Sequence, residues 1–522
     1  MPKPRRIPSP KRCRHLIVVL GDQLDADSPA LANADAAEDV VLMVEAPAES
    51  TQAWSAKARI TFFLSAMRHF AAGLRERGLT VDYLALGTHT HEGLDAAIAA
   101  AARRHSPDRL IVVEPGEWRV ERLLDEASRQ AGIPLVVLVD THFYVPRAEF
   151  ARWAAGYKQI RMESFYRWMR KQTGVLMEGG EPAGGRWNFD ADNRESFGRE
   201  GPPPGPARPT FTPDAITRSV MKDVERHYSS HPGSTGRFDW PVTRAQALGA
   251  LEAFVRDRLP VFGRHQDAMW AGEPTLSHSL LAAALNVKLL NPREVVAAAE
   301  AAWQAGQAPI ESVEGFIRQI LGWREFIRGM YWVDMPAMAQ ANHFGHRAPL
   351  PRWYWTGKTR MQCMRESIGQ TLELGYAHHI QRLMVTGQFA LLAGVDPAEA
   401  AKWYLGVYVD AVEWAELPNV AGMALYANGG RFTSKPYVAS GAYIDRMSNY
   451  CRGCPYRPKE STGERACPVT TLYWDFLDRN EREFAGHPRT ALMVKNLQRL
   501  SDGQRQAIRD WARRTRERID EL

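Results

Sequence analysis

Four of the five cysteines lie in one stretch of the chain, and their spacing limits the folds that could bring them together. Cys451 and Cys454 form a C-x-x-C pair, Cys467 follows on the same loop, and Cys363 lies far upstream. Proline follows both Cys454 and Cys467, which removes a backbone donor and fixes the turn. Four thiolates can hold a cubane iron–sulfur cluster or a structural zinc ion, although zinc usually takes two C-x-x-C knuckles. The spacing favours iron–sulfur over zinc, and buried free thiols are the alternative without a metal.

Charge and hydropathy narrow the class of protein further. No apolar run approaches the length of a membrane span, so we expect no membrane partner. Residues 1–14 hold six basic side chains and no acid, and they account for the whole net charge of +6. We expect a disordered basic arm there, because a secretory signal would need an apolar centre. Few cysteines and a C-x-x-C pair suit a reducing cytoplasm, which is the expected location.

Short apolar runs alternate with helix-like segments in the first part of the chain. The runs at 15–20, 40–44, 109–113 and 134–139 predict a parallel, doubly wound α/β sheet over residues 15–145. Residues 146–245 are predicted to be a connector. Apolar residues at three and four spacing predict a large all-α domain over residues 246–522.

The connector contains a basic and aromatic segment at residues 157–172. Such a mixture can grip a nucleic-acid backbone and stack a base. An amphipathic surface helix has the same composition, and the sequence leaves both interpretations open. No G-x-G-x-x-G motif opens a helix after a strand, so a flavin would have to sit inside the helical domain.

The order of several segments, together with the four cysteines, resembles the iron–sulfur bacterial cryptochromes and photolyases, which are the prokaryotic (6-4) photolyase family. The resemblance covers nearly the whole chain. Its segments are Gly-Asp-Gln-Leu 21–24, Glu-Pro-Gly-Glu-Trp-Arg 114–119, Arg-Met-Glu-Ser-Phe-Tyr-Arg 161–167, Gly-Arg-Trp-Asn-Phe-Asp 185–190, Gly-Phe-Ile-Arg-Gln-Ile-Leu-Gly-Trp-Arg-Glu 315–325 and Tyr-Trp-Thr-Gly-Lys 354–358.

The resemblance implies three cofactors: FAD, a [4Fe-4S] cluster on the four cysteines, and an antenna chromophore that is typically 6,7-dimethyl-8-ribityllumazine. Without it, the same side chains would be read as helix caps, turn residues or surface charges. The implied FAD contacts are Gln266, Asp267, His278, Ser279, Arg324, Asp410, Glu413, Glu416 and Asn419. Asp410 and Glu413 are expected to lie one helical turn apart on one side. The implied antenna residues are Gly21, Asp22, Gln23 and Glu49.

The resemblance also implies roles in chemistry. His378 and His379 would lie at the DNA lesion, where one supplies a proton, with Tyr437 and Tyr443 near the same pocket. On a helix, adjacent histidines would point about 100° apart, so only one could face a ligand squarely.

A second set of aromatic residues would carry electrons. Trp355, Trp403 and Tyr404 would form a relay from the surface to the flavin, although an isolated tryptophan is usually a core residue.

Three functions remain open at this point. The leading hypothesis is a monomeric DNA photolyase that uses light to repair (6-4) pyrimidine photoproducts in damaged DNA. The second is a cryptochrome, a light-sensing protein with the same fold and little repair activity. The third is a light-independent iron–sulfur protein that binds DNA.

Overall fold

The chain forms one parallel sheet of five strands, and the sequence predicted the parallel sheet and four of these strands. The computed structural model describes residues 12–486 and 488–522. The strand order is β3-β2-β1-β4-β5, so the chain winds outward from a central β1 in both directions. In register, Ile17 of β1 pairs with Val41 of β2 and Ile111 of β4. The strands are β1 His15–Val18, β2 Val40–Val44, β3 Thr80–Leu84, β4 Arg109–Val113 and β5 Leu135–Leu138.

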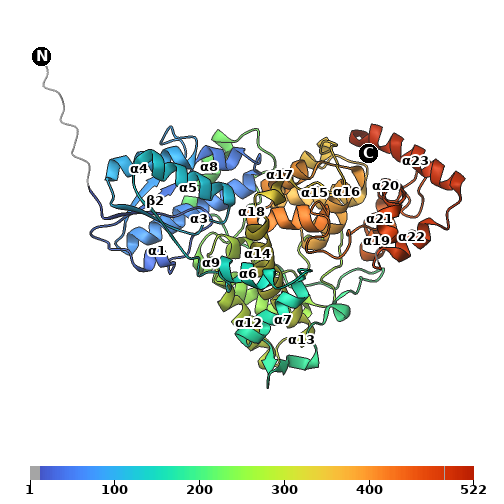
Figure 1. Cartoon of the computed structure of the whole chain (residues 1–522), viewed down its shortest axis with the longest axis horizontal. Helices are drawn as coiled ribbons and strands as arrows, with labels where there is room; N and C mark the ends of the chain where they lie inside the picture. Colours follow the sequence, from blue (N-terminus) through green and yellow to red (C-terminus); the bar gives the residue numbers. More distant parts are fainter. Residues whose placement is uncertain (1–11, 487) are drawn as a thin grey trace, which may run out of the picture.

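Both faces of this sheet are buried, because successive side chains of a strand point to opposite faces. Leu16 and Val18 pack into a core with α4 and α5, whereas Ile17 packs into the core that contains α3. The helices of this α/β domain are α1 Pro29–Ala32, α2 Pro47–Thr51, α3 Lys57–Glu76, α4 Leu94–His105 and α5 Trp118–Ala131. The domain forms the left-hand side of Figure 1.

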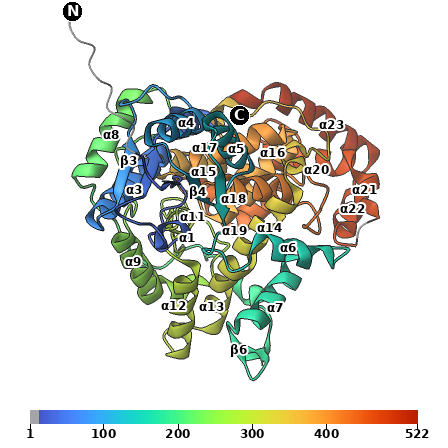
Figure 2. The same cartoon turned by 60° about the vertical axis from the view of Figure 1, so that its left-hand side comes forward.

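The connector is built from separate pieces rather than one linker. Helix α8 (Ala215–His227) returns to the α/β domain and packs against α3 (Figure 2), where Asp223 pairs with Arg68 at 2.8 Å. Helices α6 (Arg147–Ala155) and α7 (Met162–Thr173) lie against the helical domain, and a hairpin of β6 (Met177–Glu178) and β7 (Glu181–Pro182) follows.

Helix α7 shows how part of the basic and aromatic segment is packed. Phe165 and Tyr166 are fully buried, and the buried Arg170 donates to the carbonyl oxygens of Leu176 and Trp187. These side chains belong to the core, which supports the amphipathic-helix interpretation of this stretch.

The rest of the chain is helical, as predicted. Four of its segments are π-helical, a form that is frequent at functional sites: η3 Phe254–Arg258, η4 Arg318–Arg324, η7 Gln381–Gly387 and η8 Pro418–Ala424. The α-helices are α9 Arg244–Ala253, α10 Leu259–Phe262, α11 Ala282–Asn286, α12 Pro292–Gln304, α13 Ile310–Ile317, α14 Glu325–Asp334, α15 Gln362–Leu374, α16 Gln388–Ala393, α17 Pro397–Val407, α18 Glu413–Leu417, α19 Gly441–Met447, α20 Pro468–Arg479, α21 Glu481–Ala485, α22 Ala491–Leu497 and α23 Asp502–Glu517.

Buried polar contacts join the two domains. Lys288 of the helical domain pairs with Asp140, which lies just beyond β5, at 2.8 Å, and both side chains are almost fully buried. Burial raises the pKa of Asp140, but Lys288 and Arg328 outweigh it and hold this pKa below its ordinary value. The contact therefore fixes the loop after β5 against the helical domain.

Most of the predicted basic arm lies outside the described residues. Residues 12–14 are described, and they contact the α/β domain: Arg12 pairs with Asp108, and Arg14 pairs with the buried Asp39. In the described part of the chain, no helix is long and apolar enough to cross a membrane.

Candidate active site

The helical domain encloses a cavity of about 470 Å³. Three π-helical segments, η4, η7 and η8, contribute to its wall. Eight of the nine predicted FAD contacts line it, together with three of the four predicted lesion residues. These are Gln266, Asp267, His278, Ser279, Arg324, Asp410, Glu416, Asn419, His378, His379 and Tyr437. The sequence thus predicted most of the polar lining of this cavity.

Two predicted residues lie outside that lining. Glu413 lies at the border between the domains, where its neighbours are Tyr331 of α14 and Glu117 of the α/β domain. The expectation that Asp410 and Glu413 share one side of a helix is wrong, because α18 begins at Glu413 and Asp410 lies in the turn before it. Tyr443 packs near the cavity on α19, under the guanidinium of Arg446.

Arg382 organises the polar floor of the cavity. Its guanidinium donates to both carboxylate oxygens of Asp410 at 3.0 Å and to Glu416 at 3.0 Å. Burial would lower the pKa of Arg382, but these two carboxylates raise it overall. Burial raises the pKa of Glu416, and Arg382 opposes that rise. The Arg382 guanidinium is thus fixed by two acids of the cavity lining.

The two histidines occupy the same wall but in different settings. His378 precedes the helical segment and is buried, and its ring stacks on His278 with centroids 4.4 Å apart. Neither ring nitrogen of His378 has a hydrogen-bond partner among the described residues. His379, at the start of the helical segment, is exposed to the cavity. Both rings therefore reach the cavity, because the pair is not embedded in a regular helix.

The chemistry of the lining fits a flavin dinucleotide. Arg324 has two buried nitrogens, Nε and Nη1, that make no hydrogen bond within the described chain, although Nη1 lies 3.6 Å from a Glu325 oxygen. Burial lowers the pKa of this arginine to about 10. Buried donors of this kind are costly unless a ligand satisfies them. Glu416, Asp410 and Asn419 add oxygen and amide groups to the same lining. The cavity size falls within the usual range for small-molecule sites.

The predicted electron relay is compact at its inner end. Trp403 of α17 is fully buried and contacts Tyr404 and Tyr354, each with ring centroids 5.0 Å away. The Tyr404 hydroxyl donates to the carbonyl oxygen of Arg382 at 2.6 Å, next to the cavity. Trp355 packs against Trp54 instead, and no ring contact among the described residues joins it to Trp403.

The four cysteines of the predicted metal centre line one small, enclosed cavity. Cys363 lies in the first turn of α15, and Cys467 immediately precedes α20, so both sit at the positive ends of helices, which favour thiolates. Cys451 lies in a 3₁₀ turn, and Cys454 ends it. A side chain at Gly441 would place Cβ 2.9 Å from the Cys467 sulfur, so this approach requires glycine.

No set of three or more histidine, cysteine, aspartate or glutamate side chains in the described residues is arranged to hold a metal ion. A single ion would need its thiolates to converge at about 2.3 Å from one point, whereas a cubane binds each thiolate through a different iron. All four cysteines nevertheless line the same small cavity.

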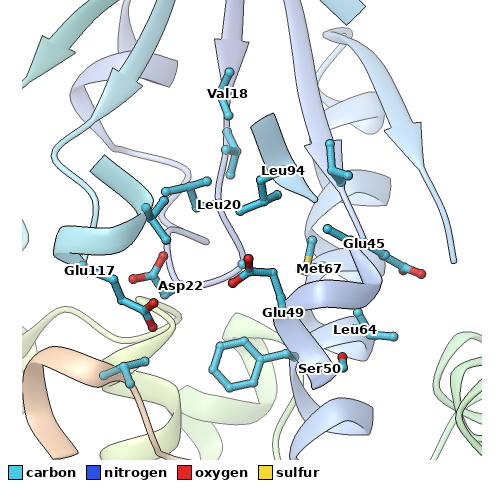
Figure 3. A pocket seen from close by; sticks show the side chains of 18 of the residues that line it. Val18, Leu20, Asp22, Glu45, Glu49, Ser50, Leu64, Met67, Leu94 and Glu117 are labelled. Atoms are coloured by element: carbon cyan, nitrogen blue, oxygen red, sulfur yellow. The ribbon is translucent and has the colours of Figure 1, made fainter. Parts of the chain in front are cut away.

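A second cavity, of about 110 Å³, lies at the carboxyl ends of β1 and β2 (Figure 3). Its lining includes Gly21, Asp22 and Glu49, as predicted, together with Arg59 and Glu117. Glu49 receives two hydrogen bonds from Arg119, at 2.6 and 2.9 Å.

The charged groups of this second cavity favour a ligand rich in donors. The Asp22 and Glu117 carboxylates border the same space in Figure 3, and burial raises the pKa of Asp22 to about 6. Arg59 keeps a buried Nε without a partner in the described chain. Gln23 is not part of the lining, because its amide donates to the carbonyl oxygens of Val113 and Glu114 and ties two loops together.

A short segment separates the two cavities. Val412 lines the smaller cavity, and Trp414 and Glu416 line the larger one. Trp414 also lies against Gly116, which borders the smaller cavity. Sequence reasoning missed Trp414, Arg318 and Arg382 as cavity residues, because an arginine or tryptophan at helical spacing also suits a surface or a core.

An α/β domain joined to a helical domain that encloses a large cavity is the architecture of the photolyases and cryptochromes. Two solved structures share it: a class III photolyase from Agrobacterium tumefaciens (TM-score 0.54, 14% identity, covering 99% of this chain and 98% of that one) and a cryptochrome from Synechocystis sp. PCC6803 (TM-score 0.56, 13% identity, 93% and 94%). At these identities the likeness concerns the fold alone.

Sequence comparison identifies the family. Residues 17–240 match the family model described as deoxyribodipyrimidine photo-lyase-related protein. The chain is 46% identical over 495 residues to the (6-4) photolyase of Agrobacterium fabrum (strain C58), covering 95% of this chain and 97% of that relative. The chain belongs to the (6-4) photolyase family.

Proposed function

We propose that this protein is a DNA photolyase that repairs (6-4) pyrimidine photoproducts in a light-dependent reaction. The observation that carries the proposal is one cavity whose wall combines His378 and His379 with eight predicted FAD contacts. The relative that matches almost the whole chain has this activity in its name. The partner is damaged DNA, whose lesion base must leave the duplex to reach an enclosed site.

FAD would be held by Arg324 and by the polar groups around Arg382. When bound and reduced, it supplies an electron on illumination. The side chains of this chain bind and orient it: the Arg382 pairs with Asp410 and Glu416 hold the floor rigid, and Trp414 closes the side toward the α/β domain. Trp403 and Tyr404 would carry electrons toward this cavity when the flavin has to be reduced.

His379 would donate the proton that repair requires. A (6-4) product requires a hydroxyl group to move between bases, and this step needs a proton donor. Burial among protein atoms and the charge of Arg382 lower the pKa of His379 to about 4, so the imidazole is neutral at neutral pH. A DNA phosphate or a negatively charged lesion beside the ring would favour its protonated form. His378, with two free ring nitrogens, is placed to accept or relay that proton.

Two further groups complete the proposal. Cys363, Cys451, Cys454 and Cys467 would hold a [4Fe-4S] cluster, and what supports this is that all four line one small cavity. The smaller cavity would hold an antenna chromophore, which we propose to be 6,7-dimethyl-8-ribityllumazine, because its hydroxyl groups can donate to Asp22, Glu49 and Glu117. We propose that the protein acts as a monomer in the cytoplasm, where thiols stay reduced.

The test is light-driven repair of a synthetic oligonucleotide that carries one (6-4) product, with the flavin reduced beforehand. We expect repair in light, none in darkness, and none of an oligonucleotide that carries a cyclobutane dimer. Flavin-loaded protein that absorbs light but repairs neither lesion would favour the cryptochrome. Purified protein without flavin would favour the light-independent iron–sulfur protein.

A further inference from the structure

We propose that Trp54, a residue of the α/β domain, is the surface end of the electron relay, so that reducing electrons enter through one domain and reach the cavity of the other. The inference rests on the proposed function, because it extends the route through Trp403. Trp355, the outer member predicted from the sequence, is partly covered, and what covers it is the ring of Trp54, with centroids 4.6 Å apart.

Trp54 is placed where a terminal relay residue has to be. Trp54 is 41% exposed, so reductants in solution can reach its ring. The residue also has φ of +43°, in the left-handed region that side chains rarely adopt. Neither the exposure of this ring nor the strained backbone stabilises the fold. Such strain tends to persist at functional positions.

The surrounding contacts hold the Trp54 ring in a defined place. The backbone N–H of Ala56 donates to the carbonyl oxygen of Gly406 on α17, the helix that carries Trp403. A Cβ at Gly406 would lie 2.3 Å from the Ala53 carbonyl oxygen, so the close approach of this loop to α17 requires glycine. In Figure 1, α17 lies at the border with the α/β domain. The His231 ring lies edge-on to the Trp54 ring, with the ring centroids 6.4 Å apart.

A covalent and hydrogen-bonded path links the outer pair to the inner relay. The indole Nε1 of Trp403 donates to the carbonyl oxygen of Tyr354 at 3.0 Å. That carbonyl belongs to the peptide bond between Tyr354 and Trp355. One hydrogen bond and one peptide unit therefore connect Trp403 with Trp355, and a ring contact connects Trp355 with Trp54.

On illumination the relay would pass one electron to oxidised FAD, which leaves Trp355 oxidised by one electron. Trp54 then gives one electron to Trp355 and releases its indole proton to water. A small thiol in solution then returns one electron and one proton to Trp54. Two thiols consumed in this way join as one disulfide.

The experiment compares the parent with Trp54→Phe, Trp355→Phe and Trp403→Phe, all loaded with oxidised FAD and illuminated with a small thiol. Trp511→Phe is the matched control, because Trp511 is a partly covered tryptophan on α23, whose ring lies by Arg514. We expect Trp54→Phe to slow the loss of oxidised-flavin absorption severalfold at unchanged flavin content and melting temperature, and Trp511→Phe to match the parent.

A second readout follows the protein rather than the flavin. A nitroso spin trap added during illumination should form an adduct that peptide mass spectrometry locates on Trp54. Parent-like photoreduction in Trp54→Phe, with Trp355→Phe and Trp403→Phe both slow, would overturn the Trp54 assignment alone. Parent-like photoreduction in Trp403→Phe would overturn the whole relay, and Trp54 with it. The repair assay with flavin reduced beforehand tests the proposed function independently of either result.

Discussion

The imidazole rings of His278 and His378 are stacked, with centroids 4.4 Å apart and planes inclined by 14°. His278 is itself fixed by the carbonyl oxygens of Thr275 and Gln266, which lie within hydrogen-bond distance of its two ring nitrogens. Burial lowers the pKa of His278 to about 4 and holds that of His378 well below its ordinary value. The stack is therefore a contact between neutral rings, and it orients His378 while leaving both of its nitrogens available.

The cysteine cavity gives a prediction about metal content. Cys363→Ser should remove the cluster, because it deletes the only ligand from α15, and purified protein should lose its complement of about four irons per chain. The melting temperature should fall, since the free energy of metal binding is also free energy of folding. Iron analysis and thermal unfolding measure both effects.

Cys13→Ser is the matched control for this change. Cys13 is buried in the α/β domain and is not part of the cysteine cavity. The Cys13→Ser protein should therefore keep its iron. One zinc per chain in the parent would contradict the assignment of a cluster.

The Arg382 ion pairs give a prediction about stability. Arg382→Met should lower the free energy of unfolding by about 3–5 kcal/mol, because it leaves two buried carboxylates without their partner. Flavin content should fall as well. The matched control is Arg352→Met, which breaks the exposed ion pair with Asp520. It should lower the free energy of unfolding by no more than about 1 kcal/mol. Equal effects of the two changes in denaturant unfolding would refute the structural role of Arg382.

Glu413 gives a prediction about pH. Burial and the nearby Glu117 raise the pKa of Glu413 from 4.5 to about 7, so the folded state favours the protonated acid. Its contribution to stability is present below pH 4.5 and is lost as the pH rises through about 7. Glu413→Gln should therefore flatten the pH dependence of the unfolding free energy, by no more than about 3 kcal/mol between about pH 5 and 8. Glu76→Gln, on the surface of α3, should leave the parent's pH profile unchanged.

Several parts of the molecule could be predicted from the sequence, because the residue pattern there is one that the local structure requires. Uninterrupted apolar runs are what strands buried on both faces require, and they predicted β1, β2, β4 and β5. Strand β3 was not recognised: it lies at the edge of the sheet, and its Asp82 is paired with His105 at 2.7 Å, so it lacks a continuous apolar run. The cysteine pattern correctly indicated that four distant residues meet.

The remainder depended on geometry that spacing does not encode. The start of α18 decides on which side of the wall Glu413 lies, and no cap residue before it marks that start. The π-helical segments shift the register of the side chains, so a regular helical count misplaces them. The path beyond Trp355 could not be seen, because Trp54 belongs to another domain and meets it only in the folded chain.

His379 carries the decisive prediction for repair. His379→Ala should lower light-driven (6-4) repair by about 10²–10⁴-fold, the usual contribution of a general acid or base, while flavin content and photoreduction persist. His378→Ala should also impair repair, because His378 lines the same cavity and neither of its ring nitrogens makes a hydrogen bond within the described chain. His343→Ala is the control, because His343 is an exposed histidine that pairs with Glu483 at 2.7 Å and does not line the cavity.

The assay counts repaired oligonucleotide per photon absorbed, with the flavin reduced beforehand so that the relay does not limit the rate. Full activity in both His378→Ala and His379→Ala would show that neither ring supplies the proton, although the family assignment would stand.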